Sequence, residues 1–268
     1  MPPSTGLRAR MRAELTREIK DEARRQLAAD GAPNLSLRAV TRSLGMASSA
    51  IYRYFPSRDD LLTALIVDAY DALGAAAEAA DAGCARTDYG GRWLAVGTAI
   101  RDWAVANPHE YALVYGSPVP GYRAPEETVV PASRVTRTLA RIVDEAAVGD
   151  ALVPPTGGPP LPPLDAVLRA EADRMVELAF PHVDVAVVVR SVIAWTQLFG
   201  MVSFELFGHF NTVVDAVGTL FGRSLLEMGR FVGLPAPDRT PGDHRFPLAV
   251  DPTDGTVPGD DEEAFYLI

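Results

Sequence analysis

The 268-residue chain contains a single cysteine, Cys84, so a disulfide framework within the chain is excluded and a reducing compartment is expected. No apolar run follows the arginines near the N-terminus, and the sequence therefore predicts no secretory signal. A bilayer-spanning helix takes about 20 apolar residues. The most apolar stretch, residues 183–207, is interrupted by Asp184, Arg190 and Glu205. We expect a soluble, cytoplasmic protein without a membrane partner.

The sequence also lacks the residue spacings of common catalytic and metal sites. None of its four histidines stands at ligand spacing from a second histidine or cysteine. Cys84 lies among alanine and glycine, and no glycine-rich phosphate loop follows a strand pattern. An enzyme is therefore the disfavoured alternative, and we expect no catalytic residues, no metal and no cofactor.

The net charge of −10 argues at first sight against a nucleic-acid partner, but the charge is unevenly distributed. Residues 1–60 carry eleven Arg and Lys against seven Asp and Glu, a balance of +4. The rest of the chain therefore carries a balance of −14. Such asymmetry is typical of a small DNA-reading module on an acidic body, although proteins that touch no DNA also show it.

Helical periodicity and the absence of a two-residue alternation predict an all-α fold. Residues 1–10 show no apolar period and suggest a flexible basic arm. An N-terminal helix-turn-helix domain is expected over residues 11–57, and a larger helical domain over residues 58–234. A proline-rich insert at 153–163 is expected to be a surface loop or disordered, and an acidic tail at 235–268 is expected to be disordered, because their composition favours no packed structure.

Residues 37–55 have the pattern of a helix-turn-helix. Leu37, Val40 and Leu44 lie at helical spacing, and Gly45 supplies the tight turn. Small residues then begin a predicted recognition helix, Ser48–Tyr54, which Ile51 and Phe55 would anchor inward. Pro56 ends that helix, and Ser57 with Asp60 three residues later predicts the cap of the next one.

The run Leu44–Leu62, and above all Tyr52-Arg-Tyr-Phe-Pro-Ser-Arg58 with the leucines after it, resembles the tetracycline-repressor (TetR) family of bacterial regulators. The resemblance is specific for residues 12–66 and architectural beyond them. It implies a homodimer that binds double-stranded operator DNA and releases it when a small molecule binds the larger domain. The function expected is a sequence-specific transcriptional repressor with a small hydrophobic or aromatic effector.

The resemblance also implies DNA-contacting positions. Ser36 and Arg38 match residues near the phosphate backbone, and Arg58 matches a phosphate-contacting lysine. Ser48, Ser49 and Ala50 match base-edge positions, and Tyr52 and Tyr54 the aromatic contacts. The helical pattern places Arg53 on the same face. Two departures affect which residue reads a base: Ala47 replaces a capping serine, so that Ser48 would cap instead, and Arg58 differs from lysine in donor geometry.

The larger domain contains an aromatic-rich set that could line an apolar effector pocket. Ordinary core packing is the alternative for each of these side chains. The predicted pocket residues are Trp103, His109, Tyr111, Tyr115, Trp195, Phe199 and Phe204.

The last two long helices are apolar nearly all round, which predicts burial on both sides and hence a symmetric dimer interface. A deeply buried hairpin in a monomer is the alternative. The predicted interface residues are Val188, Val192, Val217, Gly218, Phe221, Gly222 and Leu225. A partner-binding adaptor whose helix-turn-helix has lost DNA affinity remains a rival to the regulator.

Overall fold

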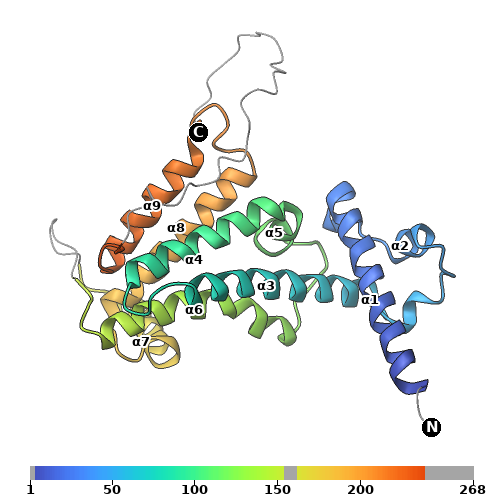
Figure 1. The fold of residues 1–268 in the computed structure, drawn as a ribbon, viewed down its shortest axis with the longest axis horizontal. Helices are drawn as coiled ribbons and strands as arrows, with labels where there is room; N and C mark the ends of the chain where they lie inside the picture. Colours follow the sequence, from blue (N-terminus) through green and yellow to red (C-terminus); the bar gives the residue numbers. More distant parts are fainter. Residues whose placement is uncertain (1–3, 154–161, 239–268) are drawn as a thin grey trace.

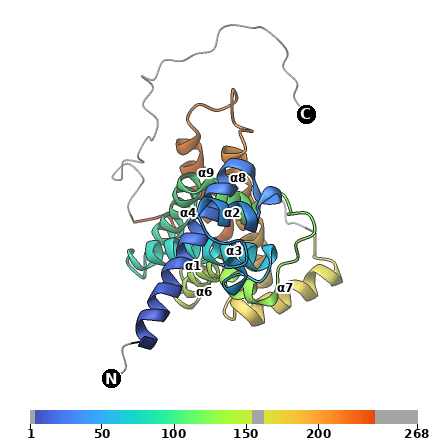
Figure 2. The ribbon, with the colours of Figure 1, turned by 90° about the vertical axis from the view of Figure 1, so that its right-hand side faces the viewer.

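The computed structural model describes residues 4–153 and 162–238, and in these ranges every regular element is a helix (Figure 1). The predicted all-α class is confirmed for this part of the chain. Two buried clusters form its cores, one in the N-terminal domain and one in the larger domain. Figure 1 shows the small domain at one end of an elongated molecule, and Figure 2 views the molecule from that end.

The small domain consists of α1 (Ser4–Asp30), the 3-10 turn η1 (Ala32–Asn34), α2 (Leu37–Ser43) and the 3-10 turn η2 (Ile51–Arg53). Helix α1 begins at Ser4, so the prediction of a flexible arm over residues 1–10 was wrong for residues 4–10. Leu7, Arg8, Ala9 and Arg10 are good helix formers, and a helix that is already packed extends readily through such residues. The helical pattern of apolar residues does not extend into this segment, because the segment buries no side chain.

Helix α3 (Arg58–Ala82) belongs to both domains. Its first turns place Leu61, Leu62 and Leu65 in the small core, and Leu73 and Ala77 lie in the larger one. The domain boundary therefore lies inside a continuous helix and not at Ser57, where we predicted it.

The predicted cap of α3 is present. Asp60 donates its backbone N–H to Ser57 Oγ at 3.1 Å, and the hydroxyl of Ser57 donates to the Asp60 carboxylate at 2.7 Å.

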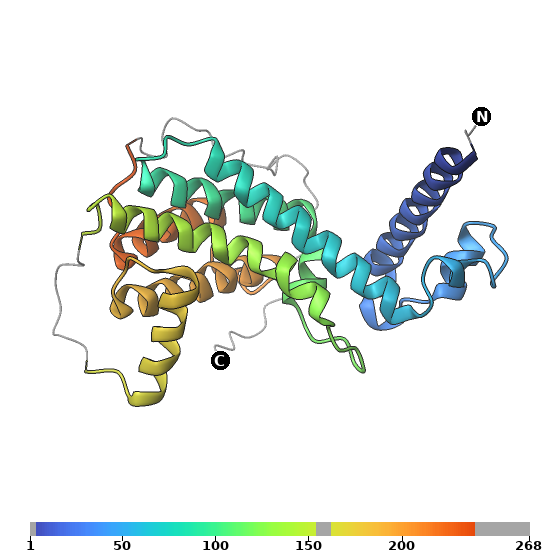
Figure 3. The same cartoon turned by 90° about the horizontal axis from the view of Figure 1, so that it is seen from below.

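The larger domain is a helical bundle in which α4, α5 and α6 lie beside α3 (Figures 1 and 3). After α3 come α4 (Tyr89–Ala106), α5 (Pro108–Tyr115), the 3-10 turn η3 (Glu126–Thr128), α6 (Val129–Val148), α7 (Ala166–Ala179), α8 (Val185–Leu206) and α9 (Val217–Val232). Sequence reasoning missed α7, which follows the proline-rich insert and buries only Ala172 fully. Such a sparse apolar stripe gives little periodic signal.

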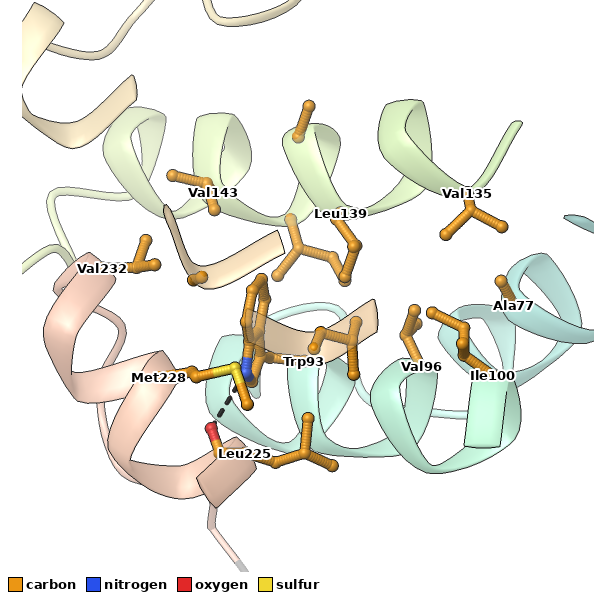
Figure 4. Packing of buried hydrophobic residues seen from close by; sticks show 14 of the residues in the cluster. Ala77, Trp93, Val96, Ile100, Val135, Leu139, Val143, Leu225, Met228 and Val232 are labelled. Carbon is orange, nitrogen blue, oxygen red and sulfur yellow. Dashed lines mark hydrogen bonds between the residues drawn. The ribbon is translucent and has the colours of Figure 1, made fainter. Parts of the chain in front are cut away.

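The central packing joins α4, α6 and α9 (Figure 4). Trp93 is buried and donates its Nε1–H to the Leu225 carbonyl at 3.0 Å. Gly97 lets α4 approach α9 closely, because a Cβ there would lie 2.4 Å from Leu225 Cδ2. Helices α4 and α9 therefore pack against each other within one chain.

Helix α8 has the length and mean hydropathy of a membrane span, 22 residues with an index of 1.7. One side of it lies in the core, however, where Val188, Ala194 and Leu198 are fully buried. A core helix of this kind accounts for the apolar composition.

The predicted insert and tail lie largely outside the described residues. Residues 235–238 are described and pack on the start of α4, where Asp238 donates its backbone N–H to Asp88 Oδ1 at 3.2 Å. A Cβ on Gly90 would lie 2.2 Å from the Pro235 carbonyl oxygen. The predicted disorder is therefore wrong for these four residues.

Candidate DNA-binding surface and effector cluster

The turn between α2 and η2 has the geometry that the sequence predicted. Ser36 caps α2 by accepting the Ala39 N–H at 3.4 Å. Gly45 has φ +65°, a left-handed conformation in which an L side chain would be strained. Met46 donates its N–H to the Thr41 carbonyl at 2.9 Å and packs against the small core. The turn is therefore held by capping, backbone hydrogen bonds and a plugging side chain.

Ile51 and Phe55 are buried, as predicted, and fix the segment that follows the turn. They leave Tyr52 half exposed, at 50%, and Arg53 exposed. Ser48 and Ser49 are exposed and Ala50 is half-buried, whereas Arg38 lies exposed on α2. These exposed residues carry hydroxyl, phenol and guanidinium groups, and we call Arg38, Ser48, Ser49, Tyr52 and Arg53 together the recognition surface.

The predicted recognition helix Ser48–Tyr54 is shorter than expected. The structure has turns over Ser48–Ala50 and only the single 3-10 turn η2 after them. Ala50 occupies the N-cap position of η2, and no side chain accepts a capping hydrogen bond there. The prediction that Ser48 caps this segment was therefore wrong. The serine side chains of Ser48 and Ser49 compete for backbone groups, which disfavours a regular α-helix at its start.

Arg58 makes contacts within the chain that its predicted role did not include. Its Nε donates to the Leu35 carbonyl at 3.1 Å, and its Nη2 donates to the carbonyls of Ala32 and Pro33 at 2.8 and 3.2 Å. A planar guanidinium suits such a cluster of acceptors. Arg58 thus ties the connection between α1 and α2 to the start of α3, and we do not include it in the recognition surface.

Sequence reasoning missed Arg12. Its Nη2 donates to the Arg53 carbonyl at 2.9 Å, and its guanidinium carbon lies 5.3 Å from the centre of the Tyr54 ring. A signal existed in the sequence, because Arg12 continues the buried stripe of Leu15 and Ile19 one turn toward the N-terminus.

Four of the seven predicted pocket residues come together between α5 and α8. The ring centre of Tyr115 lies 5.1 Å from that of Tyr111 and 4.3 Å from that of Phe199, and Trp195 lies 5.9 Å from Phe199. Tyr70 of α3 joins at 6.0 Å from Tyr115, a contribution that the sequence did not reveal. We call these five rings the aromatic cluster.

Some polar atoms of the aromatic cluster have hydrogen-bond partners and one does not. Tyr111 donates to the Phe199 carbonyl at 3.1 Å and its hydroxyl lies 2.9 Å from Ser203 Oγ. Burial raises the pKa of Tyr115 far above its usual range and also raises that of Tyr111, so both phenols stay neutral. Trp195 Nε1 is buried without a hydrogen-bond partner among the described residues. That N–H is a donor to which an acceptor could bind.

The other three predicted pocket residues do not join the aromatic cluster. His109 is exposed at the start of α5, and Trp103 is half-buried against the core. Phe204 is 52% exposed and packs its ring on His209 and Phe210. Spacing on α8 could not tell which ring turns inward, because that depends on where α5 lies.

A hollow of about 420 Å³ opens at the ends of α6 and α9 and the start of α8. Its lining includes Asp150, His182 and Arg190 but none of the predicted pocket residues. Within residues 4–153 and 162–238, no group of three or more His, Cys, Asp or Glu side chains is arranged to hold a metal ion.

The structure contradicts the predicted dimer interface at four positions. Val188, Phe221 and Leu225 are at most 1% exposed, and Gly222 is buried as well, so these residues belong to the core of the chain. Val192, Val217 and Gly218 are partly exposed. On α8 both the core-facing and the outward-facing sides carry apolar residues, so apolar composition did not distinguish them, whereas the outward side of α9 carries Arg223, Glu227 and Arg230.

The outward side of α8 carries Ile193, Gln197, Gly200 and Phe204, which lie on one helical face. Ile193 is 46% exposed, and a Cβ at Gly200 would meet no atom within 4 Å. We call these four residues the outer face of α8.

Family models match both domains. The model described as "Bacterial regulatory proteins, tetR family" matches residues 19–65, and the one described as "Tetracyclin repressor-like, C-terminal domain" matches residues 93–228. The HTH-type transcriptional regulator Rv1816 of Mycobacterium tuberculosis (strain ATCC 25618 / H37Rv) is 39% identical over 206 residues, which cover 77% of this chain and 86% of the relative.

Solved structures agree with this match. The regulatory protein SCO4313 aligns with a TM-score of 0.67 at 33% identity, covering 82% of this chain and 97% of that one. A protein of unknown function from Rhodococcus sp. RHA1 has a TM-score of 0.58 at 24% identity, covering 80% and 94%, and that likeness concerns the fold alone.

Proposed function

The chain belongs to the TetR family of helix-turn-helix transcriptional regulators, and we propose that it is a homodimeric repressor that a small aromatic or hydrophobic effector releases from its operator. The observation that carries the proposal is the recognition surface: Ile51 and Phe55 anchor a segment that exposes Tyr52 and Arg53 beside two serines. Hydroxyl and guanidinium groups read base edges, and exposed arginines contact phosphates.

Dimerisation follows from the outer face of α8. Ile193 and Phe204 expose apolar side chains on this face, which favours burial against a partner, and Gly200 leaves room for a second helix to approach. A two-fold interface would present two recognition surfaces to successive major grooves of one operator.

The aromatic cluster is the proposed effector site. An aromatic ligand would stack on Tyr115 and Phe199, and an acceptor atom on it would bind the Trp195 N–H. The cluster is closely packed, so an effector must separate its rings. Because Tyr111 and Tyr115 are both on α5, that separation would displace the helix that also contacts α1.

This function requires no catalysis, and it places the protein in the cytoplasm with its DNA. The chain offers the features of a sensor and a DNA reader, which is why we propose a regulator and not an enzyme.

The test is binding of the full chain to a duplex from the region upstream of its own gene. We expect a salt-sensitive complex with two chains per site, which Tyr52→Ala weakens by about tenfold or more while the melting temperature stays within a degree or two, because one good base contact contributes about 1–3 kcal/mol. Tyr52→Phe is the matched control for the ring alone. A folded dimer that binds no duplex at low salt would show an adaptor instead.

A further inference from the structure

The first three turns of α1 extend past the core of the small domain (Figures 1 and 3). Burial on this helix starts at Leu15 and continues through Ile19 and Ala23, whereas residues 6–14 are all exposed. At 1.5 Å per residue, the overhanging part measures roughly 15 Å. Nothing within the small domain accounts for a helix of this length.

All the charged residues of this overhang, residues 4–13, are basic. Between Ser4 and Ala13 the sequence has three arginines, Arg8, Arg10 and Arg12, and no acidic residue. The first carboxylate is Glu14, which pairs with Arg17 at 3.9 Å. Neither Arg8 nor Arg12 has an ion-pair partner among the described residues. A cluster of cations on an otherwise acidic protein indicates an anionic partner.

The helical phase separates these arginines into two faces. Residues four apart lie one above the other on a helix, so Arg8 and Arg12 continue the stripe of Leu15, Ile19 and Ala23 that faces the rest of the small domain. Arg10 lies on the opposite side and donates its Nε to the Gly6 carbonyl at 3.3 Å. Only Arg8 and Arg12 therefore point to the side on which η2 lies.

Arg12 fixes the position of this stripe relative to the recognition surface. Its bond to the Arg53 carbonyl and its contact with the Tyr54 ring place it directly against η2. Arg8 lies four residues further toward the N-terminus on the same face, about 6 Å along the helix axis, and is exposed to solvent. A duplex bound against Tyr52 and Arg53 would run past this turn with its phosphates.

We propose that the overhang of α1 is a second DNA-contacting element, in which Arg8 binds a backbone phosphate beside the major groove that the recognition surface reads, and Arg12 holds η2 and α1 in the required alignment. The inference rests on the proposed DNA binding and adds a contact outside the helix-turn-helix. A phosphate contact carries no sequence information, so the overhang would add affinity to every duplex alike.

Counterion release gives a quantitative test. Each phosphate contact contributes about 0.9 to the slope of log K against log salt, so losing one contact from each chain of a dimer lowers the slope by about 1.8. We expect Arg8→Gln to show this drop, on the upstream duplex and on an unrelated duplex of equal length. The factor by which affinity falls between 50 and 200 mM salt would then be roughly tenfold smaller for Arg8→Gln than for the unchanged protein.

Arg10→Gln is the matched control, because it removes the same charge from the same three turns on the opposite face. It should leave the slope unchanged, and Arg8→Lys should retain the full slope. Equal slopes for Arg8→Gln and the unchanged protein would overturn the inference while leaving DNA binding intact. Equal drops for Arg8→Gln and Arg10→Gln would overturn it too, because charge alone and not the face would then matter. If the unchanged protein binds neither duplex, the proposed function itself fails.

Discussion

Arg24 of α1 and Glu110 of α5 form an ion pair that joins the DNA-binding domain to the larger domain, with Arg24 Nε donating to Glu110 Oε1 at 2.9 Å. Arg24 also donates to Asp68 of α3 at 2.7 Å, and Lys20 reaches the same carboxylate at 2.8 Å. Three helices therefore meet at one cluster of charges.

The residues that follow Glu110 continue this connection. Tyr111 packs in the larger core, whereas Leu113 and Val114 pack against the small one. Tyr70 donates its hydroxyl to the Val114 carbonyl at 3.3 Å. Helix α5 thus contacts both the core of the small domain and the aromatic cluster. A displacement of Tyr111 and Tyr115 would therefore also move the residues of α5 that contact α1.

We predict that Glu110→Gln weakens the contact between the domains without unfolding either. The pair is about three-quarters buried, so the loss is about 1 kcal/mol, measured by urea unfolding at neutral pH. Arg17→Ala, which breaks the exposed pair with Glu14 on the same helix, is the control and should change stability by less than about 0.5 kcal/mol. Equal effects of the two variants would contradict a special role for the α1–α5 pair.

Arg58→Ala distinguishes a structural arginine from a phosphate contact. Removing the guanidinium leaves the carbonyls of Ala32, Pro33 and Leu35 without their donor, and we expect a loss of about 1–3 kcal/mol in unfolding free energy. The slope of DNA affinity against salt should stay the same for the folded fraction. An unchanged stability with a reduced slope would instead support the role that the sequence predicted.

Arg92 and Asp81 form a buried ion pair that stabilises the end of the larger domain. Arg92 is fully buried and donates its Nε to Asp81 Oδ1 at 2.7 Å, and its Nη1 to Glu145 at 2.7 Å. Arg92→Ala leaves a buried carboxylate with fewer donors, so we expect a loss of about 3–5 kcal/mol in chemical denaturation. A loss below about 1 kcal/mol would show that water replaces the guanidinium.

The same pair predicts a dependence of stability on pH. Burial opposes ionisation of Asp81, but hydrogen bonds from Arg92 and Arg86 outweigh it and hold its pKa below the usual value. A carboxyl whose pKa is lowered in the folded state stabilises the fold above its unfolded pKa, near 4, and loses that contribution as the pH falls. The unfolding free energy of Asp81→Asn should therefore fall less steeply below about pH 5 than that of the unchanged protein. The exposed Asp173→Asn is the control.

Ile193→Asp tests the proposed dimer interface. A charge in the middle of the outer face of α8 should convert the dimer to a monomer in size-exclusion chromatography with light scattering, because burying an unpaired carboxylate is costly. Val167→Asp, on the exposed side of α7, introduces the same charge elsewhere and should leave the dimer intact. A dimer that persists in Ile193→Asp would place the interface on another surface.

Residues 37–62 show which structural features the sequence of this protein predicts correctly. The spacing of Leu37 and Val40, the turn at Gly45 and the cap at Ser57 are all local, and each appears in the structure where it was predicted. Such features depend on neighbours within a few residues, so the pattern by itself determined them, and with them the family and the all-helical class.

The assignment of individual side chains needed the tertiary structure. Arg58 and Arg12 are both arginines near the recognition surface, yet one holds a loop and the other supports η2, because that depends on which carbonyls the fold brings within reach. Likewise, Val188 and Ile193 have the same apolar character on one helix, and only the position of α4, α7 and α9 decides that the first is buried and the second exposed. Local patterns determined where the helices begin, turn and end, whereas contacts between residues far apart in the chain decided which of their faces remain open for DNA, an effector or a second copy.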